Sequence, residues 1–311
     1  MPDTPPPYLY KFRSFNPHLI AELCNSEIYF ASPITLNDPL DSKPSIILDL
    51  PLERLEELFC RTMEESPKSG DPARELAICR YNATEGTSDA LAIQQRYKLS
   101  VELKIHQMLL NWIGSTGVLS LASNWDCPLM WSHYGAQHTG VCLEYSTRDH
   151  VAKNLLMVRY DAPRSVSLQD LYDWKLKGDF AARKRVLETS FLAKAPAWSY
   201  EEEWRCLARS SGPHSVPFDL AAIYFGERCN SSVRTAIVKT MHDRSKPLHF
   251  YDVSFSQDNF ALRRDEVDLE EVLQVGLRPS PALLFGRVPL SDEWASKIPI
   301  PPEQESDPKL Y

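Results

Sequence analysis

The 311-residue sequence predicts an α+β fold with a helical insertion. Strand-like and helical segments follow one another irregularly, without the strict strand–helix–strand repeat of a doubly wound fold. The nucleotide-binding patterns G-x-G-x-x-G and G-x-x-x-x-G-K-[ST] are also missing. We expect a disordered lead over residues 1–7, one domain over 8–297 and a flexible tail over 298–311.

The first segments predict a strand, a helix and a second strand. Tyr8–Phe12 has the alternation of a strand. Asn16 and Pro17 form a helix start, because Asn caps well and Pro is tolerated at the first helical position. Glu27–Ala31 predicts the next strand, and Asn37–Asp41 has the composition of a turn.

The stretch from 51 to 113 is helical in character and predicts the insertion. Pro51–Met63 places its leucines and Phe59 on one face, Asp71-Pro72 starts a second helix, and Ser88–Ile113 predicts a longer third one. We expect these helices to pack on the sheet rather than to form an independent domain.

The second half returns to strands mixed with helices. The predicted strands are Gly117–Ser123, Gly140–Tyr145, Leu156–Tyr160, Glu202–Ala208, Ala221–Phe225, His249–Phe255 and Phe260–Arg263. The predicted helical segments are Leu168–Phe191 and Ser231–Met241.

The overall charge and hydropathy exclude several classes of protein. The net charge is −8 and the pI about 5.6, which does not indicate a nucleic-acid partner. No apolar run reaches the roughly 20 residues that span a bilayer, and the first residues do not resemble a secretion signal. We therefore expect a cytoplasmic protein without a membrane partner.

The seven cysteines include no C-x-x-C pair, so we expect mostly reduced core residues and no zinc cluster.

The acidic triplet Glu201–Glu203 is the strongest candidate for chemistry. In a strand, Glu201 and Glu203 share a face, so their carboxylates repel and one pKa is expected to rise. A solvated strand start would be the simplest interpretation, but three aromatic residues flank the triplet and indicate partial burial. Arg205 follows and requires an anionic partner.

Three other segments contribute candidates. In Met130–Tyr134, Trp131 is most simply a core residue, while His133 is either a general base or a structural histidine. Its spacing to His138 is poor for a metal site. Tyr8–Arg13 is either a protected edge strand or an anion-binding strand that uses Lys11 or Arg13. Asp38 and Asp41 are placed to meet Arg13 or Arg205.

Together these segments resemble a bacterial family known as domain of unknown function 2971. The residues that carry the resemblance are Leu9–Arg13, Phe30–Pro33, Asn37–Asp41, Met130–Tyr134, His138–Tyr145 and Trp198–Arg205. Their order and spacing are similar to the family's from about residue 8 to about residue 226.

The order of elements is also similar to that of the ADP-ribosyltransferase fold. This resemblance implies a mixed, mostly antiparallel sheet, NAD as the candidate substrate, and Glu203 as the carboxylate that stabilises an oxocarbenium-like transition state. It implies that Glu201 activates the acceptor, that Tyr134 stacks on nicotinamide, and that Tyr10, Lys11 and Arg13 hold the adenosine ribose or the pyrophosphate. The remaining candidate binding residues are Asn37, Asp38, Asp41, Ser123, Trp131, His133 and Arg205.

Three functions remain open at this point. The first is an NAD-dependent ADP-ribosyltransferase-like enzyme, acting as a toxin or a phage-defence factor, with no metal. The second is a non-enzymatic module that binds a nucleotide or a protein. The third is a metal-dependent nucleotide hydrolase in which Asp38, Asp41 and Glu203 bind a divalent ion.

Overall fold

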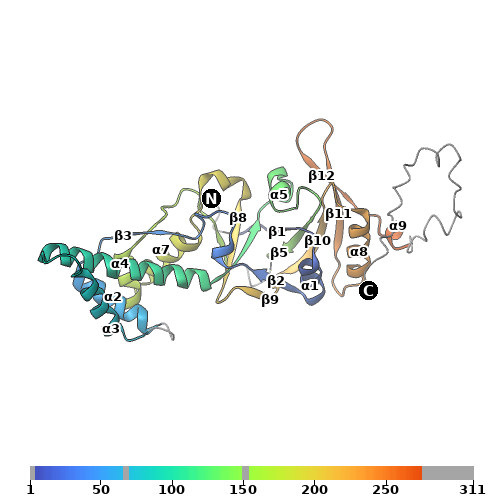
Figure 1. The fold of residues 1–311 in the computed structure, drawn as a ribbon. Helices are drawn as coiled ribbons and strands as arrows, with labels where there is room; N and C mark the ends of the chain where they lie inside the picture. The colour runs from blue at the N-terminus through green and yellow to red at the C-terminus, as the bar shows by residue number, and fades with distance from the viewer. Residues whose placement is uncertain (1–3, 66–69, 149–153, 275–311) are drawn as a thin grey trace, which may run out of the picture. The chain divides into compact units, whose positions relative to one another are not determined.

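An eight-stranded sheet organises most of the chain (Figure 1). In spatial order its strands are β12 (Leu262–Glu266), β11 (His249–Phe255), β10 (Asp219–Phe225), β5 (Val141–Ser146), β1 (Tyr8–Arg13), β4 (Gly117–Ala122), β8 (Glu203–Ala208) and β6 (Leu155–Met157). Every neighbouring pair is antiparallel except β10 and β11. The α+β class with a mostly antiparallel sheet is therefore confirmed.

This computed structural model describes residues 4–65, 70–148 and 154–274. The chain divides into two units, residues 1–267 and 268–311, and the described part of the second unit contains α9 (Leu269–Gln274). The predicted tail over 298–311 lies outside the described residues. In the predicted lead, the carbonyl groups of Pro6 and Pro7 accept hydrogen bonds from Thr147.

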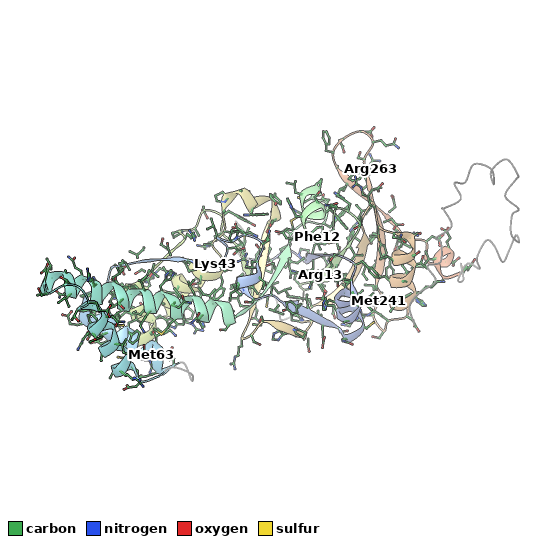
Figure 2. All side chains as sticks on the ribbon, viewed as in Figure 1. Phe12, Arg13, Lys43, Met63, Met241 and Arg263 are labelled. Atoms are coloured by element: carbon green, nitrogen blue, oxygen red, sulfur yellow. The ribbon has the colours of Figure 1, made fainter. Side chains whose placement is uncertain are left out.

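Strand β1 lies in the middle of the sheet, so the interpretation as an edge strand was wrong. It pairs with β5 along its whole length, from Tyr8 opposite Ser146 to Arg13 opposite Val141. Its side chains alternate as predicted. Phe12 packs in a hydrophobic cluster with its ring centroid 5.2 Å from that of Trp131, while the neighbouring Arg13 (Figure 2) forms an ion pair with Glu22.

The sheet forks at β4. Strand β1 pairs with β4 only at Tyr10 and Ala122. Further along the same strand, Val118 exchanges two hydrogen bonds of 2.8 Å with Ala31, which directly follows β2 (Glu27–Phe30). β1 and the residue after β2 therefore pair with β4 at different points along it, and a cavity lies between them.

Helix α1 (Pro17–Asn25) joins the two arms of the fork. Asn16 caps it by accepting a hydrogen bond from the backbone N–H of Leu19, and Pro17 occupies the first position, as predicted. The helix ends at Asn25, and the left-handed φ of 52° at the capping residue Ser26 turns the chain directly into β2.

The helical insertion is present and builds its own core. It consists of α2 (Leu52–Glu64), α3 (Pro72–Ala83) and α4 (Ala90–Ser115), which pack with α6 (Leu168–Lys177) and α7 (Phe180–Phe191). Met63 of α2 (Figure 2) is buried in this core, and Val118 of β4 belongs to the same cluster. Val118 thus connects the insertion to the sheet.

Several short elements were not predicted. Strand β3 (Ser45–Ile47) pairs with β7 (Ser165–Ser167), and β9 (Gly212–Ser215) pairs with β2. The serines of β3 and β7 and the Gly-Pro of β9 are typical of loops, so local composition opposes the pairing that tertiary contacts impose. The first unit also contains the helix α5 (Pro128–His133) and the predicted helix α8 (Ser231–Met241).

Two predictions about the whole chain can be compared with the described residues. Within them, no helix has the length and apolar character needed to cross a membrane. All seven cysteines are free, but Cys79, Cys142 and Cys206 alone are buried, fewer than expected, and Cys24 is exposed.

Candidate active site

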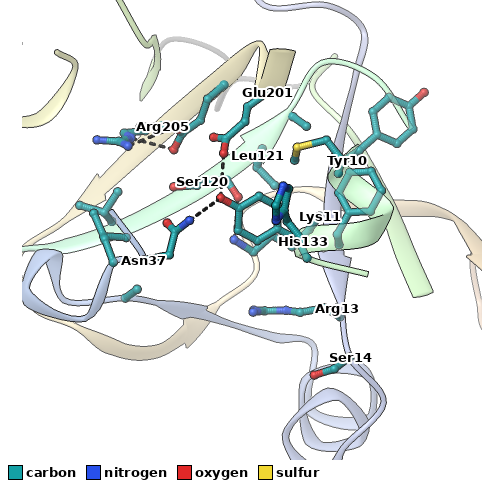
Figure 3. Close-up of a pocket in the computed structure, with 18 of the residues that line it drawn as sticks. Tyr10, Lys11, Arg13, Ser14, Asn37, Ser120, Leu121, His133, Glu201 and Arg205 are labelled. Carbon is teal, nitrogen blue, oxygen red and sulfur yellow. Dashed lines mark hydrogen bonds and ion pairs between the residues drawn. The ribbon is translucent and has the colours of Figure 1, made fainter. Parts of the chain in front are cut away.

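The fork holds a cavity of about 440 Å³ (Figure 3). Strands β1, β4 and β8, helices α1 and α5 and the segment after β2 all contribute to its wall. Ten of the candidate residues from the sequence line it: Tyr10, Lys11, Arg13, Asn37, Asp41, His133, Tyr134, Glu201, Glu203 and Arg205. The structure thus brings together four segments that are far apart in the sequence.

Glu202, which has a left-handed backbone conformation, directs the side chains of Glu201 and Glu203 toward the same ammonium group. Strand β8 begins at Glu203, while Glu201 ends a 3-10 helix (Pro196–Glu201), so the two do not share one strand as expected. Glu202 between them has a φ of 42°. Its carbonyl accepts a hydrogen bond of 2.8 Å from Ser123 Oγ, and its side chain accepts one of 2.9 Å from Asn124. This local reversal lets both flanking carboxylates reach the same ammonium group.

That ammonium belongs to Lys194, which the sequence reasoning missed. Its Nζ donates hydrogen bonds to Glu201 Oε2 and, at 2.8 Å, to Glu203 Oε2. It also lies 3.8 Å from Asp41 Oδ2, and its side chain is only 4% exposed. Lys194 is the single charge in the apolar run from 191 to 196, and a buried lone lysine requires an anionic partner. That signal was available in the sequence.

Arg205 is the second buried cation of the site. Its guanidinium pairs with both carboxylate oxygens of Asp41 at 2.9 and 2.6 Å, and with those of Glu203 at 2.8 and 3.1 Å. It also donates to the carbonyl of Phe191 at 2.6 Å. Of the partners expected for Asp41, the structure selects Arg205. We call Asp41, Lys194, Glu201, Glu203 and Arg205 the buried charge cluster.

The two glutamates of this cluster have opposite tendencies to hold a proton. Burial raises the pKa of Glu203, but the cations of Arg205 and Lys194 outweigh it and bring the pKa well below the ordinary value. Burial also raises the pKa of Glu201, and there Lys194 offsets the effect only in part. Glu203 therefore stays anionic, while Glu201 is the group that can gain and lose a proton.

Tyr134 connects Glu201 to the opposite wall of the cavity. Its hydroxyl donates to Glu201 Oε1 at 2.7 Å and accepts from the Asn37 amide at 2.9 Å, the dashed lines in Figure 3. Burial and the neighbouring Glu201 raise the pKa of this tyrosine, so it remains a neutral donor. Asn37 thus fixes the direction in which Tyr134 donates.

Arg13 and Lys11 of β1 also line the cavity. Arg13 forms a two-point ion pair with Glu22 of α1, with N–O distances of 3.1 and 2.6 Å. Lys11 donates to the carbonyl of Ser120 on β4 at 2.7 Å. Burial, followed by the charge of Arg13, lowers the pKa of Lys11 to about 7.

His133 of the cavity wall packs with two other aromatic rings. The ring centroid of His133 lies 6.3 Å from that of Tyr200, in a stacked arrangement, and 6.2 Å from that of Trp198. The indole N–H of Trp198 donates to Asp38 Oδ2 at 2.8 Å. Asp38 therefore positions an aromatic ring and does not line the cavity.

Two further candidates, Trp131 and Ser123, contact residues of the site without lining the cavity. Trp131 is fully buried and donates its indole N–H to the carbonyl of Trp125, so it is the core residue that the simpler interpretation predicted. Ser123 holds Glu202 and accepts a hydrogen bond of 3.2 Å from Trp204. Neither of them lines the cavity, so we do not assign them contact with a ligand.

The carboxylates do not favour a metal site. Asp41 and Glu203, two of the three expected ligands, are paired with Arg205, so a divalent ion would have to displace a buried guanidinium. Across residues 4–65, 70–148 and 154–274, no three His, Cys, Asp or Glu side chains are grouped as metal ligands. In the described residues, the three ligands expected by the hydrolase interpretation are hydrogen-bonded to Trp198 and Arg205, and that function stays a prediction.

Comparisons with known proteins add one finding. No curated protein and no solved structure matches the chain, so the likeness to the ADP-ribosyltransferase fold stays a prediction. The family described as "Protein of unknown function (DUF2971)" matches residues 130–206, the segment that carries Tyr134, Lys194, Glu201, Glu203 and Arg205, and the resemblance of the chain to that family is thereby confirmed.

Proposed function

We propose that the cavity binds NAD, breaks its bond between nicotinamide and ribose, and transfers ADP-ribose to an acceptor. The observation that carries the proposal is the pair of buried carboxylates on one wall, of which Glu203 is held anionic and Glu201 is held ready to exchange a proton. Paired carboxyl groups with separated pKa values are typical of acid–base catalysis at glycosidic bonds.

The two carboxylates have different tasks in this proposal. When the C–N bond to nicotinamide breaks, positive charge develops on the ribose, and a fixed anion nearby stabilises that state. Glu203 supplies this charge, although its oxygens already accept hydrogen bonds from Arg205 and Lys194. Glu201 has fewer partners, so we assign it the contact with a ribose hydroxyl and the removal of the acceptor's proton.

The rest of the cavity matches the other parts of a dinucleotide. Tyr134 presents its ring to the cavity wall beside Glu201, which suits contact with nicotinamide. Arg13 is the stronger candidate for a phosphate contact, since the fork geometry of a guanidinium matches phosphate oxygens and Arg13 can exchange Glu22 for a phosphate. Lys11, with a pKa near 7, is only partly charged at neutral pH. Tyr10 also belongs to the cavity wall.

The proposal is tested by incubating the purified full chain with NAD and measuring released nicotinamide and bound ADP-ribose. We expect turnover in the wild type and a loss of about 100-fold or more in Glu201→Gln, the typical effect of removing one transition-state contact. Glu202→Gln is the matched control, because Glu202 is the exposed neighbour of both glutamates and should keep its activity.

The same experiment separates the competing functions. If NAD raises the melting temperature of the protein without being consumed, the chain is a binding module rather than an enzyme. If NAD neither binds nor reacts, and Glu201→Gln behaves as Glu202→Gln does in both assays, the proposal fails.

A further inference from the structure

Lys11 presents an amine to the cavity with one described partner. Its Nζ donates to the carbonyl oxygen of Ser120 at 2.7 Å. Among the described residues, no carboxylate lies within ion-pair distance of this nitrogen, in contrast to Lys194, which contacts three. The cavity has room for a ligand beside it, at about 440 Å³.

The surroundings of Lys11 favour its neutral form. Enclosure in the protein removes water from the ammonium, and Arg13, two residues further along β1, adds repulsion. The more distant Glu203, Glu22 and Glu201 oppose these effects only in part. The other titratable or charged groups of the cavity wall are Tyr10, His18, Asp41, His133, Tyr134, Lys194 and Arg205.

A neutral amine in this position is a nucleophile. It keeps its hydrogen bond to Ser120 and has a lone pair available for a carbonyl carbon, as lysines in desolvated pockets do. We propose that Lys11 is a covalent attachment site, at which its amine forms an imine with the aldehyde group of a small aldose-like ligand in the cavity.

The reaction balances with groups that line the same cavity. The lone pair of Nζ attacks the aldehyde carbon, and the C–N bond forms as the carbonyl oxygen takes a proton. The resulting carbinolamine then loses its hydroxyl group and the second amine hydrogen as one water molecule, which leaves the C=N bond. We assign the proton transfer of this dehydration to Glu201, because it lines the same cavity as Lys11 and burial raises its pKa.

The polar groups of the cavity point to a hydroxylated ligand. Besides Lys11, the wall offers carboxylates at Glu201 and Glu203, an amide at Asn37 and a hydroxyl at Tyr134. These groups are paired within the protein, and a sugar hydroxyl can share or replace those hydrogen bonds, whereas a purely apolar aldehyde offers them none. The proposal does not depend on the cleavage of NAD.

The test traps the imine. The full chain is incubated with glyceraldehyde and cyanoborohydride, which reduces an imine to a stable amine, and modified peptides are identified by mass spectrometry between about pH 6 and about pH 9. We expect preferential labelling of Lys11, with a half-maximal rate near its pKa of about 7. An exposed lysine such as Lys246 should be labelled more slowly, because its amine is paired with Asp219 at 2.7 Å and lies outside the cavity.

Two variants complete the design. Lys11→Met should lose the labelled peptide, whereas Lys246→Met should keep it. If Lys11→Met does not fold, the peptide map of the wild type still decides the matter. Labelling spread evenly over surface lysines, or a Lys11 rate that is still rising at about pH 9, overturns the proposal. Because no NAD is present, failure of the NAD assay leaves this result unaffected.

Discussion

The ammonium group of Lys194 lies 2.8 Å from Oε2 of Glu203, and it also donates to Glu201. All three side chains are at most 5% exposed. One buried cation thus holds together two carboxylates that would otherwise repel each other. The geometry of the candidate active site depends on this contact more than on any single strand.

Replacing Lys194 by Met should lower the free energy of unfolding by about 3–5 kcal/mol at neutral pH, because removing one partner leaves buried charges uncompensated. The loss should depend on pH. Without Lys194 the pKa values of both glutamates rise, and protonation then relieves the repulsion. The difference from wild type should therefore be larger at about pH 8 than at about pH 5.

Urea denaturation at these two pH values measures the Lys194 effect. Lys184→Met serves as the control, since Lys184 is 64% exposed and lies 3.7 Å from Glu188 in a surface pair. That substitution should cost less than about 0.5 kcal/mol at either pH. A loss in Lys194→Met that is equally large at both pH values would contradict the assignment of the shared cation.

Much of the fold follows from local patterns in the sequence. Asn16-Pro17 predicts the start of α1, and the apolar spacing from 231 to 241 predicts α8 with both its ends. The central place of β1 could not be predicted in this way, because charged residues at alternate positions are typical of an edge strand. Here Lys11 and Arg13 face a cavity that opens where the sheet forks.

The sequence indicated most residues that line the cavity, but not the contacts between them. Arg205 was expected to meet an anion, and it pairs with two, Asp41 and Glu203. The role of Lys194 was not predicted, because a single lysine in an apolar run forms no recognisable motif. The left-handed turn at Glu202 was also missed, because strand alternation brings Glu201 and Glu203 to one face without it.

Arg205→Lys should be strongly destabilising although it keeps the charge. A lysine has no planar fork, so it cannot retain the paired hydrogen bonds to Asp41 together with those to Glu203 and Phe191. We expect a loss of about 3 kcal/mol or more in the free energy of unfolding, as for a broken buried pair.

Arg185→Lys is the matched control for Arg205→Lys. Arg185 contacts both oxygens of Asp170 at 2.6 and 3.0 Å, but its side chain is 53% exposed. Its replacement should cost much less than that of Arg205, because water screens an exposed ion pair. Equal losses in the two variants would show that burial does not determine the strength of the Arg205 contacts.

Tyr134→Phe should raise the pKa of Glu201 further, because the tyrosine hydroxyl donates to the carboxylate and thereby favours its charged form. The titration of Glu201, followed by NMR in protein labelled at the glutamate carboxyl carbons, should move to higher pH. Asn37→Ala should produce a smaller shift in the same direction, since Asn37 acts only through Tyr134. An unchanged titration in Tyr134→Phe would contradict the assigned hydrogen bond.

Glu202 offers a test of the backbone turn that aims the two carboxylates. With a φ of 42°, Glu202→Gly should fold at least as well as wild type, because glycine adopts this conformation without strain. Glu202→Val should lose about 1–3 kcal/mol, since a β-branched residue is disfavoured there. Thermal denaturation of the two variants provides the comparison, and a valine variant as stable as the glycine variant would argue against a left-handed residue at this position.

Lys11 should make the stability of the protein depend on pH in the alkaline range. Its pKa falls from 10.5 to about 7 on folding, so between these values the unfolded chain binds more protons than the folded one. The free energy of unfolding of wild type should therefore rise with pH across this window relative to Lys11→Met, which has no titrating group there. The free energy of unfolding of Lys11→Met should exceed that of wild type most below about pH 7, and this difference should shrink toward about pH 10. Urea denaturation across this range measures the difference, with Lys246→Met as the control, because Lys246 is 68% exposed and lies outside the cavity wall. A constant difference between wild type and Lys11→Met would mean that the amine is charged in the folded protein, which would also remove the basis for its reaction with an aldehyde.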